Sequence, residues 1–325
     1  MSELTKEKIY KNELEKVGGV GNNNLERIRS LAGGTSGATY TISTLSTTKP
    51  VTDSGAAVSQ VGSNIYLFGG STSGTKTNTI YKFNTESETI SILSATLPSY
   101  RTFLTAAQVG SNIYLFGGYQ TTTATTTIYK FNTESETIST LSATLPTAQI
   151  SMGVAVVGSN IYLFGGNKGG VNKANTIYKF DTVSETISTL STTLLNAATN
   201  IAAAQVGSNI YLFGEYTGTF TTTIYKFNTE SETISTLSAT LPTAQTQMGV
   251  AVVGSNIYLF GGSTSDTATN TIYKFDTVSE TISTLSATLP TAQISYNGVS
   301  QVGSNIYLFG GSTNTNLINK FNVSF

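Results

Sequence analysis

Few residues of this chain could carry out acid–base or nucleophilic chemistry. The 325 residues include neither histidine nor cysteine. The commonest metal ligand, the usual proton shuttle at neutral pH and every thiol or disulfide are therefore missing. The carboxylates best placed to act together are Glu215 and Asp266, which would form a glycosidase-type pair if they shared a site. Isolated, solvated acids are the simpler interpretation, so we expect no catalytic residues, no metal and no cofactor.

A second group of residues suits binding better than catalysis. The guanidinium of Arg101 could grip a carboxylate at two points. Aromatic rings with polar neighbours suit flat polar ligands such as sugars, and they also suit protein surfaces. Drift in unconstrained loops is the alternative explanation for these residues. The candidate ligand-binding residues are Tyr100, Arg101, Phe103, Tyr119, Lys168, Lys173, Glu215, Tyr216, Phe220, Asp266, Tyr296 and Asn297.

These candidates lie between six near-copies of one ten-residue phrase. The first copy spans 61–70, and the glycine that opens its turn recurs at positions 62, 110, 158, 207, 254 and 303. The spacing of about 48 residues is typical of propeller repeats. One large repeating domain, 37–325, preceded by a leader, 1–36, therefore accounts for the chain.

Each unit predicts a sheet of four strands. In the first unit we expect strands over 56–61, 65–68, 79–83 and 90–97. Gly-Ser-Asn is a tight hairpin signal between the first two strands. The second strand is apolar on both faces, which suits packing between neighbouring sheets. The fourth strand is rich in Thr and Ser, as an exposed outer edge should be.

The ends of the chain predict how the ring closes. Residues 41–45 copy the fourth strand of a unit, whereas the last unit stops after its third strand, 318–323. We therefore predict an all-β fold, a six-bladed β-propeller of four-stranded blades. Its ring is closed by an N-terminal strand that completes the last blade, and a short two-helix leader precedes it.

The leader is rich in charge, and its apolar residues recur at helical spacing. Two short helices cannot form a stable core alone, so their apolar faces must dock on the propeller, on a second copy or on a partner. We expect an attachment segment, with a loosely ordered leader as the alternative. The partner-docking candidates are Tyr10, Leu14, Val17, Leu25, Ile28 and Leu31.

The loops of such blades fall on two faces. The first-to-second and third-to-fourth turns share one face and are almost identical between units. The second-to-third loops and the crossovers between blades share the opposite face, here called the variable face, and they differ in almost every unit. All the candidate ligand-binding residues are expected on the variable face. Arg101 and Phe103 should lie near Tyr119, because their crossover enters the blade whose loop carries Tyr119.

The repeat resembles the kelch family over roughly residues 38–325. The diglycine at 69–70 and the aromatic-turn segment 83–90 match the family pattern in order and spacing. Glu215 departs from it by replacing the second glycine of the fourth unit. Isoleucine also stands where kelch repeats usually carry a fourth-strand tryptophan, at Ile90, Ile138, Ile187, Ile234 and Ile282.

The resemblance implies a propeller, and the residues present argue against two classes of enzyme that are built on such propellers. Kelch copper oxidases need histidine ligands and a tyrosine–cysteine pair, and both histidine and cysteine are absent. Six-bladed sialidases grip a carboxylate with three arginines, but Arg101 is the only arginine in the predicted ring. A carbohydrate-active enzyme is therefore a remote alternative.

Composition and charge lead to the functional hypothesis. Net charge is −1 with no basic stripe, no signal-peptide core is present, and no apolar run is long enough to span a membrane. We expect no nucleic-acid partner and no membrane insertion. The first hypothesis is a non-catalytic binding or display protein of a phage or phage-tail-like particle. Residues 1–36 would attach it to the larger assembly, and the variable face would bind a surface glycan or host protein. A soluble cytoplasmic kelch adaptor and a purely structural decoration protein are the alternatives.

Overall fold

The computed structural model describes residues 38–50, 53–72, 74–170, 172–265, 267–292, 298–310 and 316–325. The chain divides into a small unit, Met1–Thr39 with Ser324–Phe325, and a large unit, Tyr40–Val323. All the regular secondary structure in the described residues is β-strand. The expected leader helices, with Tyr10, Leu14, Val17, Leu25, Ile28 and Leu31, lie outside the described residues.

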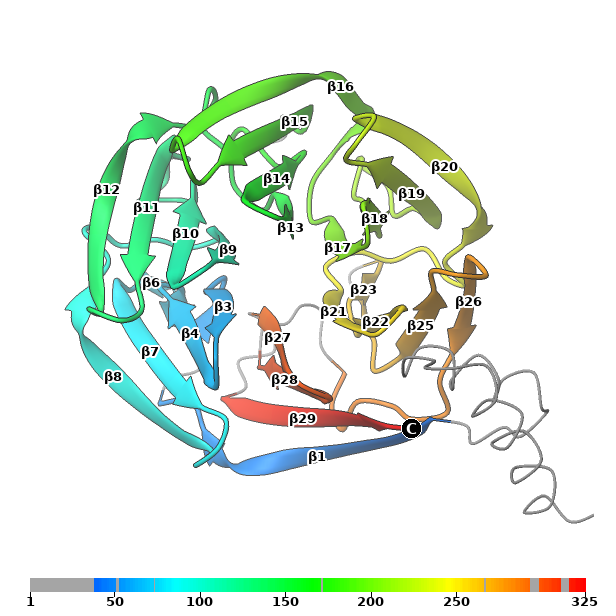
Figure 1. Cartoon of the computed structure of the whole chain (residues 1–325). Helices are drawn as coiled ribbons and strands as arrows, with labels where there is room; N and C mark the ends of the chain where they lie inside the picture. Colours follow the sequence, from blue (N-terminus) through cyan, green and yellow to red (C-terminus); the bar gives the residue numbers. More distant parts are fainter. Residues whose placement is uncertain are drawn as a thin grey trace, which may run out of the picture. The chain divides into compact units, whose positions relative to one another are not determined.

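The large unit is a ring of six antiparallel four-stranded sheets, which confirms the predicted blades (Figure 1). From the axis outward, blade 1 consists of β3 (Ala57–Val61), β4 (Asn64–Phe68), β7 (Thr79–Asn84) and β8 (Thr89–Thr96), and blade 2 of β9 (Thr105–Val109), β10 (Asn112–Phe116), β11 (Thr127–Asn132) and β12 (Thr137–Thr144). Blade 3 consists of β13 (Gly153–Val157), β14 (Asn160–Phe164), β15 (Ala174–Asp181) and β16 (Thr186–Ala198), and blade 4 of β17 (Ala202–Val206), β18 (Asn209–Phe213), β19 (Thr223–Asn228) and β20 (Thr233–Thr240). Blade 5 consists of β21 (Gly249–Val253), β22 (Asn256–Phe260), β25 (Ile272–Asp276) and β26 (Thr281–Thr284), and blade 6 of β27 (Gly298–Val302), β28 (Asn305–Phe309), β29 (Leu317–Ser324) and β1 (Thr39–Thr48).

Short strands extend the loops of the first and fifth blades. β2 (Asp53–Ser54), β5 (Ser71–Thr72) and β6 (Thr75–Lys76) form one small sheet, and β23 (Ser263–Thr264) pairs with β24 (Thr267–Ala268). They lie at the end of each blade where the second strand leads into the third. The variable loops of blades 1 and 5 are therefore partly held by backbone pairing.

The innermost strands contact one another in the order β3, β9, β13, β17, β21 and β27, and β27 contacts β3 in turn. Packing at the axis is tight at certain glycines. A Cβ atom added to Gly298 would lie 2.1 Å from Cβ of Val58, and one added to Gly249 would lie 2.3 Å from Cγ2 of Val299. Only glycine avoids these overlaps between neighbouring blades.

Each second strand packs against both neighbouring blades, as its doubly apolar sequence predicts. In β10, Ile113 and Leu115 join an apolar cluster with blade 1, whereas Tyr114 and Phe116 join another with blade 3. Aromatic pairs cross every junction in the same way. The ring of Phe131, for example, lies 5.3 Å from that of Tyr66. Such pairs add about 1 kcal/mol each to the burial of apolar area.

Five ion pairs link neighbouring blades outside this apolar core. In each pair a third-strand lysine meets the glutamate of the third-to-fourth turn in the next blade. The hydrogen bond to glutamate raises the lysine pKa, as at Lys82. These pairs are partly solvated, so each contributes little stability. They are Lys82–Glu136, Lys130–Glu185, Lys179–Glu232, Lys226–Glu280 and Lys320–Glu88, with N···O distances of 2.6–2.8 Å.

Aromatic packing replaces the ion pair at the sixth junction. Lys274 forms no ion pair with a described residue, because Tyr40 of β1 stands where the other blades carry glutamate. The Tyr40 ring lies 6.1 Å from that of Tyr258 and 5.9 Å from that of Phe321. The sheet order there is β1-β29-β28-β27, so strands from both ends of the chain share one blade.

Candidate functional site

On the variable face, short backbone pairings join the crossovers to the second-to-third loops. In the described part of the chain, the crossovers into blades 2, 3, 4 and 5 each form a bridge with the second-to-third loop of the blade that they enter. The expected proximity of the crossover 100–103 to Tyr119 is therefore present in the structure, through the bridge between Thr102 and Tyr119. The equivalent bridges are Ile150–Asn167, Thr199–Tyr216 and Thr246–Ser263.

A chain of hydrogen bonds also joins successive crossovers. The Phe103 amide donates to the Gly55 carbonyl at 2.7 Å, the Ser151 amide to Phe103 at 3.2 Å, and the Asn200 amide to Ser151 at 3.2 Å. All four residues have left-handed backbone, with φ between 53° and 69°, and so does Gln247. The same backbone conformation thus recurs at one place in each of these crossovers.

Phe103 is the exception among these left-handed residues. Glycine and asparagine tolerate positive φ, but a bulky residue there is strained. The Phe103 ring is also 43% exposed, and it lies 6.4 Å edge-on from the ring of Tyr119. The backbone strain is a cost to folding, and the exposed part of the ring gains nothing from burial. Outliers of this kind point to a functional demand on the side chain.

Two adjacent depressions flank this aromatic pair. One has a volume of about 590 Å³ and the other about 380 Å³. Lys76 and Thr121 line both, and Nζ of Lys76 lies 5.7 Å from the centre of the Tyr119 ring. Tyr100, 56% exposed, lines the larger depression. The other lining residues are Gly74, Thr75, Thr77 and Gln120 in the larger depression, and Ser71, Thr102, Phe103, Tyr119 and Thr122 in the smaller.

A second aromatic group lies over blades 3 and 4. Nζ of Lys173 lies 4.9 Å from the centre of the Tyr216 ring, and the Phe220 ring lies 5.4 Å from that of Tyr216. Lys168 is exposed in the same loop as Lys173. The structure therefore brings three of the candidate residues, Lys173, Tyr216 and Phe220, into contact here.

Arg101 lies in the interior rather than on the surface. It is 2% exposed, and its Nη2 donates to the Tyr129 hydroxyl at 3.0 Å. Gln149 stands at the same place in the next crossover and donates to the Tyr178 hydroxyl at 3.3 Å. Arg101 thus occupies a structural position of the repeat. We expected its side chain to be open to a ligand from solvent, but it is buried.

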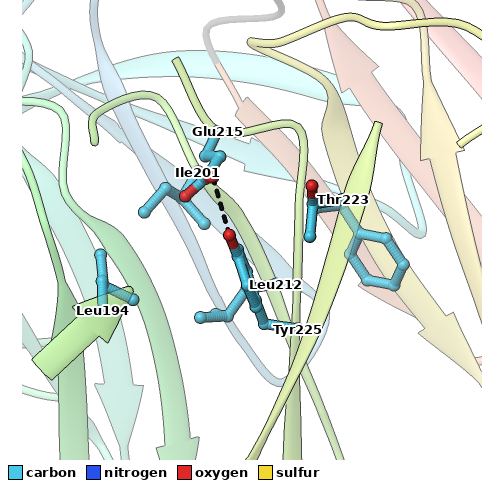
Figure 2. Close-up of a pocket in the computed structure, with 7 residues that line it drawn as sticks. Leu194, Ile201, Leu212, Glu215, Thr223 and Tyr225 are labelled. Carbon is cyan, nitrogen blue, oxygen red and sulfur yellow. Dashed lines mark hydrogen bonds between the residues drawn. The ribbon is translucent and has the colours of Figure 1, made fainter. Parts of the chain in front are cut away.

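Glu215 is also buried, at 2% exposure, and accepts a hydrogen bond of 3.0 Å from the Tyr225 hydroxyl (Figure 2). It fills the space of an interior side chain that the crossover lacks, because Ala198 stands where Gln149 stands one blade earlier. The space around it, lined partly by Leu194, has no room for a water molecule. Glu215 therefore stands beside Tyr225 together with Asn196, whose amide donates to the Tyr225 hydroxyl at 3.3 Å and to Glu215 at 3.4 Å. Burial raises the pKa of Glu215.

We expect the Glu215→Gln variant to be about 1 kcal/mol more stable than the wild type at pH 7. Glutamine keeps an acceptor for Tyr225 and removes the cost of burying a charge. Since the folded-state pKa of Glu215 lies above the ordinary 4.5, the wild type gains stability as pH falls through that pKa. Urea unfolding between pH 4 and pH 8 should show this slope in the wild type alone. Equal slopes would contradict burial of the charge.

The remaining candidates, Asp266, Tyr296 and Asn297, lie outside the described residues. In the part of the chain that is described, no group of three or more acidic residues is arranged to hold a metal. No helix there is long and apolar enough to cross a membrane. Sequence reasoning missed Lys76, although lysine recurs at this place in the third unit, where it is Lys173.

The chain matches the model of the KLHDC2/KLHL20/DRC7 Kelch-repeats domain over residues 10–198 and 200–324. The chain belongs to the kelch-repeat family. No curated protein matches it. Kelch propellers generally mediate protein–protein interactions and are generally non-enzymatic, so the family indicates a protein-interaction module.

Proposed function

We propose that this kelch propeller is a non-catalytic module that binds a protein partner through its variable face, over blades 1 and 2. The observation that carries the proposal is Phe103, a strained and exposed ring where the other described crossovers have glycine, serine, asparagine or glutamine. Strain is retained where a side chain is needed for function.

The surroundings of Phe103 support a binding role. Protein interfaces concentrate their energy in a few aromatic residues surrounded by polar ones. Tyr100, Phe103 and Tyr119 supply the rings, and threonine and glutamine side chains surround them. The described residues that line the two depressions include no carboxylate, so they offer no acid pair for glycoside hydrolysis.

The Phe103→Asn variant separates binding from stability. Asparagine occupies the equivalent position 200 with similar φ, so we expect the variant to be as stable as the wild type, or more stable by about 1 kcal/mol. We expect its affinity for the partner to fall by about tenfold or more, as for loss of an aromatic hot spot. Thermal unfolding and quantitative capture from the native source measure the two effects.

Val183→Asn is the matched control, because Val183 is 82% exposed on a turn of the opposite face. A partner retained by Val183→Asn and lost by Phe103→Asn supports the variable face. Retention of every captured protein by Phe103→Asn would refute the proposal.

Our first sequence-based hypothesis, a component of a phage-like particle that binds a host glycan or host protein, rests on composition and on the leader. An intracellular adaptor agrees equally well with the kelch family. Our proposal is therefore limited to the protein-binding face. An experiment can decide between the phage-like particle and the intracellular adaptor. Sedimentation of the native protein with large particles would favour the first setting, and sedimentation as a small complex would favour the second.

We also propose that β1 keeps the ring closed. Three contacts support this role: the packing of Tyr40 on Phe321, a hydrogen bond of 2.8 Å from Thr44 to Asn319, and one of 3.0 Å from Nζ of Lys49 to the Gly310 carbonyl. Sharing one sheet between the two ends of the chain is an efficient way to protect a propeller from opening.

A further inference from the structure

We propose that the variable face recognises an acidic polypeptide segment at two equivalent points, one over blades 1 and 2 and the other over blades 3 and 4. This inference rests on the proposed function and names the chemistry of the partner.

The two points are copies of one element. Lys173 follows Lys76 by 97 residues, and Tyr216 follows Tyr119 by the same 97. In both copies the lysine of one blade stacks on the tyrosine of the next, at 5.7 Å and 4.9 Å. The loops around them differ in length and sequence, yet the lysine–tyrosine contact is present in both. The third two-blade unit has Ala268 and Ser312 at these places, so the ring itself does not require the contact.

Three lysines on this face form no ion pair with a described residue. Among the described residues, Lys76, Lys168 and Lys173 form no ion pair, whereas five third-strand lysines each form an ion pair with a glutamate. Beneath the face, Arg101 also has no ion pair, and its Nε and Nη1 have no hydrogen-bond partner in the described part of the chain. The described carboxylates on this side of the ring are Asp53 in β2 and the buried Glu215, so Arg101 and the three lysines outnumber them. The charge of Arg101, which no described carboxylate neutralises, favours an anion on the face above it, at the point over blades 1 and 2.

The stacked geometry suits a carboxylate on a flexible chain. A lysine ammonium has three donors, and a ring beneath it holds it by cation–π attraction while leaving donors for a ligand. The ring itself offers apolar surface to the methylene groups of a glutamate or to a neighbouring side chain. Because both points lie on one rigid ring, a single acidic segment that reaches both gains affinity through effective concentration.

Synthetic peptides provide the probe. We would measure binding of a 20-residue glutamate peptide and of hexaglutamate to the full-length protein by calorimetry, at low and at physiological salt. We expect the long peptide to bind about tenfold or more tightly than hexaglutamate, since its greater length favours simultaneous contact with both points. Lys76→Ala and Lys173→Ala should each remove this advantage, and the double variant should remove binding of both peptides. Lys274→Ala is the matched control, because Lys274 lies outside this face and forms no ion pair with a described residue.

Equal binding by the wild type and the double variant would overturn the proposal, and so would equal losses in Lys274→Ala. A single-stranded oligonucleotide of the same charge that binds more tightly than the peptide would overturn the assignment to a polypeptide. Failure here is distinct from failure of the proposed function, because the Phe103→Asn variant tests capture of the natural partner without changing any lysine.

Discussion

A chain that begins at residue 50 is expected to lose its cooperative unfolding transition, whereas a chain that begins at residue 38 should keep it. The shorter chain lacks β1, the outer strand of the last blade. Without β1, Tyr258 and Phe321 lose the Tyr40 ring, and the cluster around Phe309 loses Leu45. We expect a loss of more than about 5 kcal/mol, comparable with the whole stability of an ordinary domain.

Urea unfolding followed by far-ultraviolet circular dichroism measures this effect, with the chain from residue 38 as the control. The point variant Tyr40→Ala gives an intermediate case, with an expected loss of about 2 kcal/mol for a half-buried ring. If the chain from residue 50 unfolds at the same urea concentration as the chain from residue 38, β1 does not hold the ring closed.

Replacing Gly298 by alanine is the second change with a large expected effect. Its new Cβ atom would lie 2.1 Å from Cβ of Val58 in the neighbouring blade, on a strand that contacts its neighbours around the axis. Backbone on both sides must move to relieve this overlap. We expect a loss of about 3 kcal/mol, at the upper end for overpacking of a core.

Gly303→Ala is the control for the loss of a glycine as such. Gly303 has a φ of 61°, and an added Cβ there would meet no atom within 4 Å. We expect this control to lose only about 1 kcal/mol through backbone strain. The double variant Gly298→Ala with Val58→Ala should recover part of the loss, because the two side chains compete for one space. Equal losses in Gly298→Ala and Gly303→Ala would exclude the steric explanation.

The fold was largely predictable from local patterns. A repeat near 48 residues, with an apolar second strand and a Gly-Ser-Asn turn, defines four strands per unit, and the structure has them within a residue or two of the expected bounds. The packing of β10, which includes Tyr114, against both neighbouring blades was also predictable, because a strand between two neighbours must be apolar on both sides.

The candidate site was only partly predictable. The path of the chain correctly placed Phe103 near Tyr119, since a crossover enters the next blade at that edge. The strain at Phe103 depends on a backbone angle that no pattern revealed. Lys76 escaped notice, because its contact with the Tyr119 ring joins loops of two different blades.

The sequence by itself determined the number of blades, the strands within each blade and the division into a constant face and a variable face, because these follow from periodicity along the chain. Tertiary structure alone decided which loop side chains point inward. Arg101 and Glu215 both looked like surface chemistry, yet both contact a third-strand tyrosine hydroxyl in the interior. Whether a loop residue faces solvent or the core depends on local backbone geometry and on the space left by a neighbour such as Ala198, and that space exists only once the blades have packed.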